Sequence, residues 1–374
     1  MNFLRKKFLE YYLNPKIDFP VRFDRREYAF ILFEEDTMHR HISFKSKEDL
    51  LLYLKTNVPA HAYYSSAYYR NPSAETMQEK QWMGADLIFD LDADHLPNAN
   101  NMSYEEALRA VKEELEKLID FLIEDFGFGE DELEIYFSGG RGYHCHVHNK
   151  KVLDLGSQER REIVDYLTGR GLDFKEIIKE KRIGGEITIE IDMEGGWEKR
   201  IADAIIQFFE DIRKMEKEKA IKKLMEIEGV GNKTAEDVYN SLTAERMRRI
   251  KAGLLDQATA IKKILKPLVK KVAVSLYSQT DEPVTADIKR LIRLPGSLHG
   301  KTGFRVTKVN VDKIEEFEPL RDAVVFKDNK VKIKVEKPFK IKMMDEEYDL
   351  KKGVAKVPEY LAVFAIARKF ATIG

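Results

Sequence analysis

Residues 86–94 read DLIFDLDAD, an apolar run that carries acidic residues at its end. Because side chains alternate between the two faces of a β-strand, a strand here would point its leucines and phenylalanine into a core and place Asp90 and Asp92 together on the other face. Paired carboxylates repel each other unless a cation lies between them, and they suit hard, oxygen-ligated ions such as Mg²⁺ or Mn²⁺. Two such ions can hold both the attacking and the leaving oxygen of a phosphoryl transfer. The alternative is a solvated acidic loop, which the apolar run ahead of the acids disfavours.

A glycine-rich segment, SGGRGYHCH at residues 138–146, lies between two predicted strands. It is therefore neither a Walker loop nor a Rossmann turn, since both of these open a helix. Its glycines would let backbone N–H groups approach an anion, and Arg141 could grip a phosphate with two hydrogen bonds. In the strand that follows, His144 and His146 share one face. The segment indicates a phosphate-binding hairpin, with an ordinary glycine turn as the alternative.

A third segment, RLIRLPGSLHGKTG at residues 290–303, concentrates two arginines, a histidine and a lysine among glycines and a proline. This composition is typical of a loop that binds a polyphosphate. A solvated basic turn has the same composition, so the segment taken alone does not decide between the two.

The rest of the pattern predicts a mixed α/β catalytic unit, formed by residues 1–200 and 279–374, with a helical insertion subdomain at 201–278. The insertion is expected because this region is rich in Lys and Glu and shows long helical stretches with little strand signal. Helices are expected at residues 3–13, after Ser46, from Ser103 to Gly127 and at 284–294. Strands are expected at residues 28–33, 39–44, 60–69, 85–91, 133–137, 143–148, 304–311, 323–326 and 331–335.

Composition limits the classes of function. The chain of 374 residues is 43% hydrophobic, enough for a sizeable core, and has no run of about 18 uncharged apolar residues of the kind that crosses a membrane. Its charged, amphipathic N-terminus lacks the apolar core of a signal peptide, so we expect a cytoplasmic protein. Cys145 is the only cysteine, which excludes a disulfide within the chain and a thiolate zinc cluster. With a net charge of −1, any basic face for nucleic acid has to be balanced by acidic helices elsewhere.

The three segments gain specificity in combination. Paired acids at a strand end, Ser-Gly-x-Arg-Gly-x-His and Leu-Pro-x-Ser-Leu-His-x-Lys-Thr-Gly follow one another along the chain. Together they resemble the catalytic small subunit of archaeal and eukaryotic DNA primases, most densely over residues 82–148 and 281–303. The resemblance implies a primase-type domain of mixed sheets flanked by helices, which makes short primers for DNA replication from nucleoside triphosphates on a single-stranded DNA template. It also implies a two-ion Mg²⁺ or Mn²⁺ site and a heterodimer with a primase large subunit, and it leaves the choice between ribonucleotides and deoxyribonucleotides open.

The same resemblance implies roles for individual residues. The metal-binding and catalytic carboxylates are Asp90, Asp92 and Asp281, and the residues that hold the incoming nucleotide are Ser138, Arg141, His144, Arg293, His299 and Lys301. Asp281 is preferred as the third carboxylate because it matches the family pattern of an acid, two residues, Val and then Ser or Thr, followed by a helix. Asp287 is its rival on composition alone, but we expect it inside the helix at 284–294.

The sequence departs from the family pattern at one place. Family members commonly carry a Cys/His zinc module after the paired acids, whereas here the segment PNANN at residues 97–101 leads straight into the helix capped by Ser103. We therefore expect no structural zinc. A further segment, IEGVGNKTA at residues 227–235, resembles the hairpin of a helix-hairpin-helix, whose glycine turn points backbone amides at a DNA phosphate. A plain glycine turn between two helices is the commoner explanation.

Two other functions are compatible with these motifs. One is a different primase-polymerase of the same superfamily, of the repair or plasmid-borne kind, which is usually fused to a ligase or helicase domain that this chain has no room for. The other is a nucleic-acid-binding subunit without catalysis, against which the intact carboxylates and basic loops speak.

Overall fold

The structure is a computed structural model that describes residues 2–96, 99–173, 177–183, 186–191, 193–255 and 259–374. The described chain mixes helices with several small antiparallel sheets, which confirms the expected α/β class. It divides into two compact units, one formed by Met1–Val164 with Gln279–Gly374 and the other by Asp165–Ser278. None of the described helices is long and apolar enough to cross a membrane.

The helices of the first unit begin at local signals in the sequence. Ser46 and Ser103 each accept a hydrogen bond from the amide three residues further on, and the acidic side chain at that position accepts one from the cap's own amide. Gly127, with φ of +70°, takes the left-handed conformation that follows many helix ends. The helices are α1 (Phe3–Tyr12), α2 (Lys47–Asn57), α3 (Met77–Lys80), α4 (Tyr104–Glu124), α5 (Ser157–Leu167), α12 (Glu282–Ala286), α13 (Pro319–Asp322) and α14 (Glu359–Ala367).

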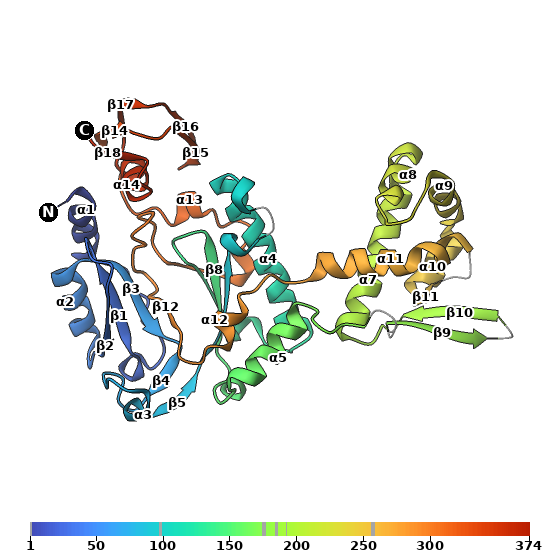
Figure 1. Ribbon diagram of the computed structural model, residues 1–374, viewed down its shortest axis with the longest axis horizontal. Coiled ribbons are helices and arrows are strands. Elements are labelled where there is room, and N and C mark those ends of the chain that lie inside the picture. The colour runs from blue at the N-terminus through green and yellow to red at the C-terminus, as the bar shows by residue number, and fades with distance from the viewer. Residues whose placement is uncertain (1, 97–98, 174–176, 184–185, 192, 256–258) are drawn as a thin grey trace. The chain divides into compact units, whose positions relative to one another are not determined.

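Two four-stranded antiparallel sheets form the body of the first unit (Figure 1). The first sheet has the order β12-β3-β1-β2, with β12 (Leu291–Arg293), β3 (Pro59–Ser65), β1 (Tyr28–Leu32) and β2 (Met38–Ile42). The second has the order β13-β7-β8-β6, with β13 (Thr307–Val309), β7 (Leu133–Phe137), β8 (Gly142–Val147) and β6 (Leu87–Asp92). Smaller sheets pair β4 (Ala67–Tyr69) with β5 (Trp82–Ala85), β15 (Phe339–Met343) with β16 (Glu346–Leu350), and β14 (Lys330–Val335) with both β17 (Gly353–Pro358) and β18 (Ala371–Ile373).

The second sheet lies between the first sheet and helix α4. On one face, Ile88 of β6 joins a buried cluster with Tyr28 of the first sheet, and the Tyr64 hydroxyl lies 3.2 Å from Nδ1 of His146 on β8. On the other face, α4 packs against β8. Because successive residues of a strand face opposite sides, His146 faces the first sheet and Tyr143 faces α4. Each side of the acidic strand is therefore buried against a different layer.

A buried ion pair also joins the two sheets. Arg26, just before β1, donates to the carboxylate of Asp86 at 2.6 Å, and both side chains are buried. The same guanidinium donates to the carbonyls of Ser65, the last residue of β3, and of Ser66, which follows it, at 2.8 and 2.9 Å. The Tyr68 hydroxyl donates to the other oxygen of Asp86 at 2.5 Å. Since Asp86 directly precedes β6, this pair ties the start of the acidic strand to the first sheet.

The second unit combines a bundle of helices with a small sheet. Its helices are α7 (Gly196–Lys214), α8 (Lys217–Met225), α9 (Asn232–Ser241), α10 (Ala244–Lys251) and α11 (Thr259–Leu276). Its sheet has the order β11-β10-β9, with β9 (Ile178–Ile183), β10 (Glu186–Ile191) and β11 (Leu254–Leu255). The unit starts at Asp165 and takes in a β-hairpin before α7, whereas the insertion was expected to start at 201 and to be helical.

The prediction of a helix at residues 284–294 is wrong. Helix α12 ends at Ala286, and Leu291–Arg293 instead forms β12, paired in antiparallel register with Tyr63–Ser65 of β3. An apolar stretch this short fits either a helix or a strand, and the partner strand decides which one forms. Asp287 is therefore the residue that follows α12, outside any helix.

Two expected strands also need correction. The strand expected at residues 323–326 is absent, since α13 ends at Asp322 and the chain continues as a turn and a bend. The strand expected at residues 60–69 is broken at Ser66 into β3 and β4, which belong to different sheets. The break allows the chain to leave the first sheet and pair with β5. The helix at 3–13 and the strands at 133–137 and 143–148 are confirmed to within a residue.

Candidate active site

Asp90 and Asp92 lie at the end of β6, where this strand pairs with β8. In the antiparallel register, Asp90 is opposite His144 and Asp92 is opposite Gly142. Asp281 reaches the same place from a distant part of the chain. It is the N-cap of α12, and its backbone amide donates a hydrogen bond of 3.0 Å to the carbonyl oxygen of Asp90. The structure thus places Asp281 beside the strand that carries the other two acids, close enough for its charge to act on Asp90.

Burial and the neighbouring negative charges raise the pKa of the Asp90 carboxyl group. Its side chain is 21% exposed, and burial, together with the charges of Asp92 and Asp281, raises the pKa of its carboxyl group to about 7. The positive charges of Arg290 and His95 oppose this rise only in part. A cation between the carboxylates would remove their repulsion, so the donor set fits a hard divalent ion.

The acids form an open set and not a closed cage. Among the described residues, no three His, Cys, Asp or Glu side chains converge to enclose an ion by themselves. Mg²⁺ typically uses one or two protein carboxylates and takes its other ligands from water and substrate phosphates. The open arrangement is compatible with that mode of binding, in which the substrate completes the site.

A pocket of about 200 Å³ opens beside the acids. Its wall combines acidic, basic and aromatic side chains from both sheets of the first unit. The lining residues are Tyr63, Asp90, Asp92, Ser138, Gly140, His144, Arg290, Leu291, Ile292, Arg293 and His299. The predicted nucleotide-binding residues among them are Ser138, His144, Arg293 and His299. Two of the predicted carboxylates and four of these residues therefore share one pocket.

The basic wall is organised around Arg293 on β12. Its guanidinium lies 4.7 Å from the centre of the Tyr63 ring and donates to Nδ1 of His61, both on the neighbouring strand β3. The amide of Gly300 also points at this Nδ1, at 3.3 Å. Because Nδ1 accepts from both, the proton of the neutral ring is on Nε2. Burial, followed by the charges of Arg293 and Lys301, lowers the pKa of His61 to about 3, so the ring is neutral at physiological pH.

The two predicted histidines of the pocket are neutral for similar reasons. Burial, with Arg293 and Arg290 nearby, lowers the pKa of His144 to about 3. Its Nε2 lies 3.5 Å from Oδ1 of Asp90, and its buried Nδ1 has no hydrogen-bond partner within the described structure. Burial likewise lowers the pKa of His299 well below its ordinary value. These rings therefore act as dipoles and hydrogen-bonding groups, and the arginines supply the positive charge.

The glycine-rich loop is fastened to the basic segment behind it. The Thr302 hydroxyl donates to the carbonyl of Gly139 at 2.6 Å, and a Cβ on Gly139 would come within 2.8 Å of the Cβ of His299. Gly142 is needed for a different contact, because a Cβ there would overlap the carbonyl oxygen of Leu91 on β6. Close packing thus explains two of the three glycines, and it holds the loop beside the acids.

Two predicted nucleotide-binding residues do not line the pocket. Arg141 is 27% exposed and pairs with Asp94, which is itself on the surface. Lys301 is exposed, and its backbone amide donates a hydrogen bond of 3.3 Å to Nδ1 of His299. The rival acid Asp287 is also exposed, and its carboxylate accepts from the Lys289 amide at 2.9 Å.

His61, Tyr63 and Arg290 belong to the site but had no assigned role from the sequence. His61 and Tyr63 lie on β3, in a tyrosine-rich stretch that reads as an ordinary core strand. Their place beside Arg293 depends on the pairing of β3 with β12, which no local pattern reports. Arg290 stands in the third motif, and its basic character was the only available signal.

Residues 97 and 98 of the shortened segment lie outside the described part of the chain, so the expectation about the zinc module is not tested. Cys145 is buried and free. Burial raises the pKa of its thiol, which disfavours the thiolate form that binds metals.

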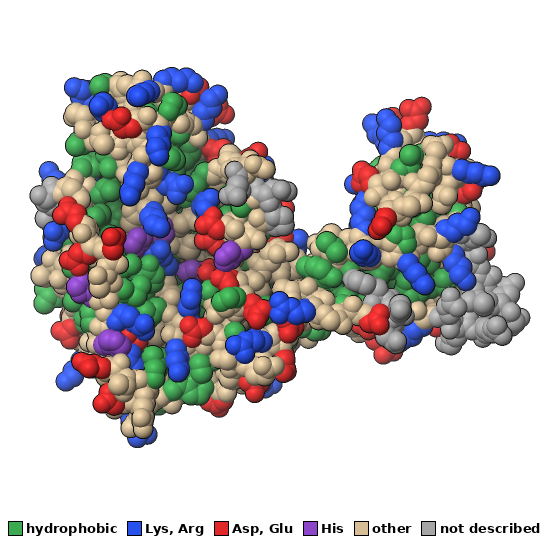
Figure 2. Space-filling model, viewed as in Figure 1, with side chains coloured by type: hydrophobic (Ala, Val, Ile, Leu, Met, Phe, Trp, Pro, Cys, Tyr) green, Lys and Arg blue, Asp and Glu red, His purple; other side chains and the backbone are tan. Residues whose placement is uncertain are grey.

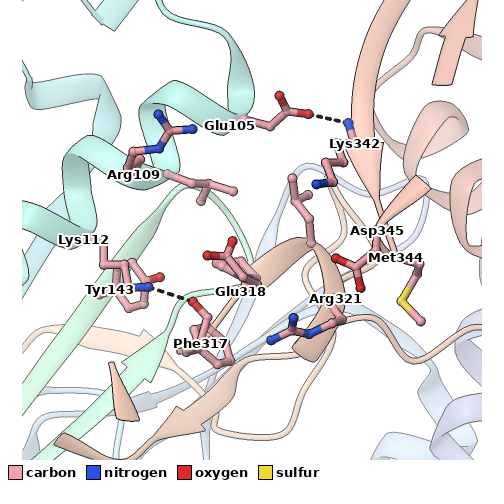
Figure 3. Close-up of a pocket in the computed structure, with 13 residues that line it drawn as sticks. Glu105, Arg109, Lys112, Tyr143, Phe317, Glu318, Arg321, Lys342, Met344 and Asp345 are labelled. Atoms are coloured by element: carbon pink, nitrogen blue, oxygen red, sulfur yellow. Dashed lines mark hydrogen bonds between the residues drawn. The ribbon is translucent and has the colours of Figure 1, made fainter. Parts of the chain in front are cut away.

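A second, larger pocket lies on the other side of β8 (Figure 3). It has a volume of about 510 Å³ and includes Leu108 and Arg109 of α4, Tyr143 of β8 and Lys342 of β15. It shares no lining residue with the acidic pocket. The acidic pocket therefore occupies only the face of the second sheet that carries His144.

Strand-end carboxylates beside a basic pocket define an enzyme of phosphoryl or nucleotidyl transfer. The DNA primase small subunit family matches residues 89–311, a range that includes every predicted site residue. The protein is 44% identical to the DNA primase small subunit PriS of Methanothrix thermoacetophila, over 100% of this chain and 98% of that protein. It is 42% identical to PriS of Archaeoglobus fulgidus, over 98% of this chain and 96% of that protein. The chain therefore belongs to the DNA primase small subunit family.

Family membership confirms the resemblance drawn from the three motifs. It also confirms the predicted activity, a nucleotidyltransferase that is the catalytic small subunit of DNA primase in replication, with archaeal relatives. The matches extend over nearly the full length of the relatives, so the likeness covers both compact units.

Proposed function

We propose that the first unit is a primase-type catalytic domain in which Asp90, Asp92 and Asp281 hold two Mg²⁺ or Mn²⁺ ions. The observation that carries this proposal is the position of the acids: Asp90 and Asp92 lie at the end of β6 beside a basic pocket, and the Asp281 amide donates to the Asp90 carbonyl. The raised pKa of Asp90, caused by burial and by the other two acids, supports it. A fold that keeps three acids so close, at a cost in stability, is best explained by a cation that they bind. When bound, the ions would lower the pKa of the primer 3′-hydroxyl and neutralise charge on the triphosphate.

The reaction proposed is attack of the 3′-hydroxyl on the α-phosphate of a nucleoside triphosphate, with release of pyrophosphate. Arg293 and Arg290 line the pocket and carry the positive charge that holds the phosphates, while Ser138 and His299 offer hydrogen bonds. His144 lies beside Asp90 and helps to orient its carboxylate. Positioning and charge neutralisation are the main contributions of a protein to phosphoryl transfer.

Arg141 and Lys301 are proposed as phosphate contacts that form when the nucleotide binds. Arg141 would exchange its surface partner Asp94 for a phosphate, and Lys301 has a flexible, exposed side chain that can turn to the ligand. Both belong to loops that are hydrogen-bonded to each other through Thr302 and Gly139, so a phosphate contact by one loop is transmitted to the other.

The relatives are named as small subunits, and we infer that this chain also works with a primase large subunit, as a heterodimer on single-stranded DNA in the cytoplasm. No structural zinc is proposed, since the single thiol is buried. The test is primer synthesis from nucleoside triphosphates on single-stranded DNA, with and without the large subunit and with ribonucleotides or deoxyribonucleotides. Synthesis of template-dependent primers by the wild-type chain supports the proposal. Binding of nucleic acid without synthesis of any primer contradicts it.

A further inference from the structure

A strongly basic face lies on the small sheet formed by β17, β14 and β18. Along β14 the apolar residues Ile333 and Val335 are buried, while Lys330, Lys332 and Lys334 alternate with them and are exposed. Figure 2 shows lysine and arginine side chains along the upper edge of this unit, where Figure 1 places β14 and β17. The sheet therefore buries one face and presents a row of lysines on the other.

The neighbouring strand adds to this charge. Lys356 on β17 is directly opposite Lys332, and Val354, which is 66% exposed, is opposite Lys334. Like charges at directly opposed positions destabilise a sheet. Within the described residues of this sheet, the outward-facing positions of β14 and β17 carry no acid, and the ion pair of Lys334 is with Glu336 beyond the strand end, at 3.2 Å.

The adjacent hairpin β15–β16 shows that a high lysine content does not by itself produce such a face. There, Lys340 is opposite Asp349 and forms an ion pair of 3.5 Å with it, and Lys342 is opposite Glu347. Lysines of the hairpin are thus matched with acids across the strands. The unmatched positive charge is a property of the β14–β17 face. An anion from outside the chain would neutralise it.

We propose that the lysine face, defined as Lys330, Lys332, Lys334 and Lys356, docks the sugar-phosphate backbone of a nucleic-acid duplex. The inference rests on the proposed function, because a primase holds the duplex formed by its primer and template. Residues i and i+2 of a strand lie about 7 Å apart, so the lysines of β14 form a row about 14 Å long. A duplex carries a phosphate every 3.4 Å along each strand, and several of these fall within reach of the row.

A duplex fits this face better than a single strand does. Proteins that bind single strands stack the bases on aromatic side chains, and the outward positions of β14 and β17 carry lysines and Val354 but no aromatic residue. A duplex keeps its bases inside and offers only phosphate and sugar to such a surface. Lysines without aromatics therefore predict backbone contact without sequence preference.

The test measures binding of a fluorescent blunt DNA duplex to the full-length protein over a range of KCl concentrations. The double variant Lys332→Gln/Lys356→Gln removes two unmatched lysines, whereas Lys340→Gln/Lys351→Gln removes two that pair with Asp349 and serves as the control with the same change of charge. Each lost phosphate contact lowers the slope of log affinity against log salt by about 0.9. We expect the first variant to lose about 1.8 in slope and roughly tenfold in affinity, and the control to bind like the wild type.

An unchanged slope in the first variant, or an equal loss in both variants, overturns the proposal. Binding of single-stranded DNA and of the purified large subunit is measured in the same variants. If the first variant loses affinity only for one of these and binds the duplex like the wild type, the proposal is also overturned, and the face is a site for that other partner. Asp90-dependent nucleotide addition, measured at saturating template in the same variants, should keep its maximal rate. That readout separates a failure of the docking face, in which nucleotide addition persists, from a failure of the proposed catalytic function, in which the wild type adds no nucleotide.

Discussion

Asp90 has an ordinary pKa of 3.8 that burial, Asp92 and Asp281 raise to about 7. A carboxyl group whose pKa is raised by folding favours the folded state below its ordinary pKa, and this contribution is lost as pH rises through the folded value. Without divalent ions, the wild type should therefore lose stability between about pH 4 and pH 7. Asp90→Asn should lose less over this range and be more stable at pH 7 by about 1–4 kcal/mol. Chemical denaturation in chelator at several pH values measures the difference, and equal pH profiles for the two proteins would contradict it.

The choice between Asp281 and Asp287 is also decided by single side chains. The negative charge of Asp281 raises the pKa of Asp90, and the Asp281 amide donates a hydrogen bond to the Asp90 carbonyl. Asp287, by contrast, is exposed, and its carboxylate accepts a hydrogen bond from the Lys289 amide. Asp281→Asn should lower the rate of nucleotide addition by orders of magnitude, and Asp287→Asn should change it by less than about threefold. Steady-state rates with Mg²⁺ and with Mn²⁺ measure both. The reverse ranking would move the third carboxylate to Asp287.

The charged residues of the site could be predicted from the sequence, but not all of the residues that lie beside them. Asp90, Asp92 and His144 lie where strand alternation put them, because β6 and β8 pair in a regular register. His61 and Tyr63 could not be predicted, since they reach Arg293 only through the pairing of β3 with β12. Local patterns report which face a residue takes, and they do not report which distant strand lies beside it.

The pairing of β6 with β8 depends on one glycine. A Cβ at position 142 would overlap the Leu91 carbonyl oxygen, which is backbone and cannot move aside, whereas a Cβ on Gly140 would meet the His299 side chain at 3.3 Å. Gly142→Ala should therefore destabilise the protein by about 2 kcal/mol or more and reduce activity, and Gly140→Ala by less than about 1 kcal/mol. Urea denaturation of both variants provides the comparison. A Gly142→Ala protein as stable as the wild type would show that this close approach does not exist.

Errors in the predicted elements have a common physical origin. The residues at 284–294 carry apolar side chains at spacings that suit a helix, yet Leu291–Arg293 gains more from joining the edge of β3 as β12. That strand aims Arg293 into the pocket, so the same pairing that defeats the local pattern also builds the site. By contrast, the helix after Ser103 has its own cap, its own apolar stripe and a terminal glycine, and it was predicted within a few residues.

On the scale of the whole unit, the Arg26–Asp86 pair connects the first sheet to the strand that carries the acids. Arg26→Met would leave the Asp86 carboxylate buried next to Tyr68 without its ion-pair partner, with Arg160 bonded only to its backbone carbonyl at 2.8 Å. Breaking a buried pair in this way costs about 3–5 kcal/mol. We expect such a loss in urea denaturation, with a smaller loss in Arg26→Met/Asp86→Leu, where both charges are removed. Equal losses for the single and double variants would mean that the pair does not couple the two sheets.

The organisation of the chain could be predicted in outline only. A mixed α/β class and a change of character in the middle of the chain follow from periodicity and composition. The start of the second unit at Asp165 does not, because no strand was expected at β9 and β10, and their local sequence does not show that they pack with the elements that follow them. Which unit a strand belongs to depends on its packing partners.

The role proposed for Asp90 and Asp92 is to make the first unit a metal-dependent nucleotidyltransferase. Its most direct test is incorporation of labelled nucleotide on single-stranded DNA by the full-length chain with a large subunit, in Mg²⁺ and in Mn²⁺. Asp90→Ala and Asp92→Ala should each abolish incorporation while the thermal unfolding transition stays cooperative and at or above the wild-type temperature, and Asp287→Ala should retain incorporation. Near-normal activity of either Asp90→Ala or Asp92→Ala with either ion would contradict the claim.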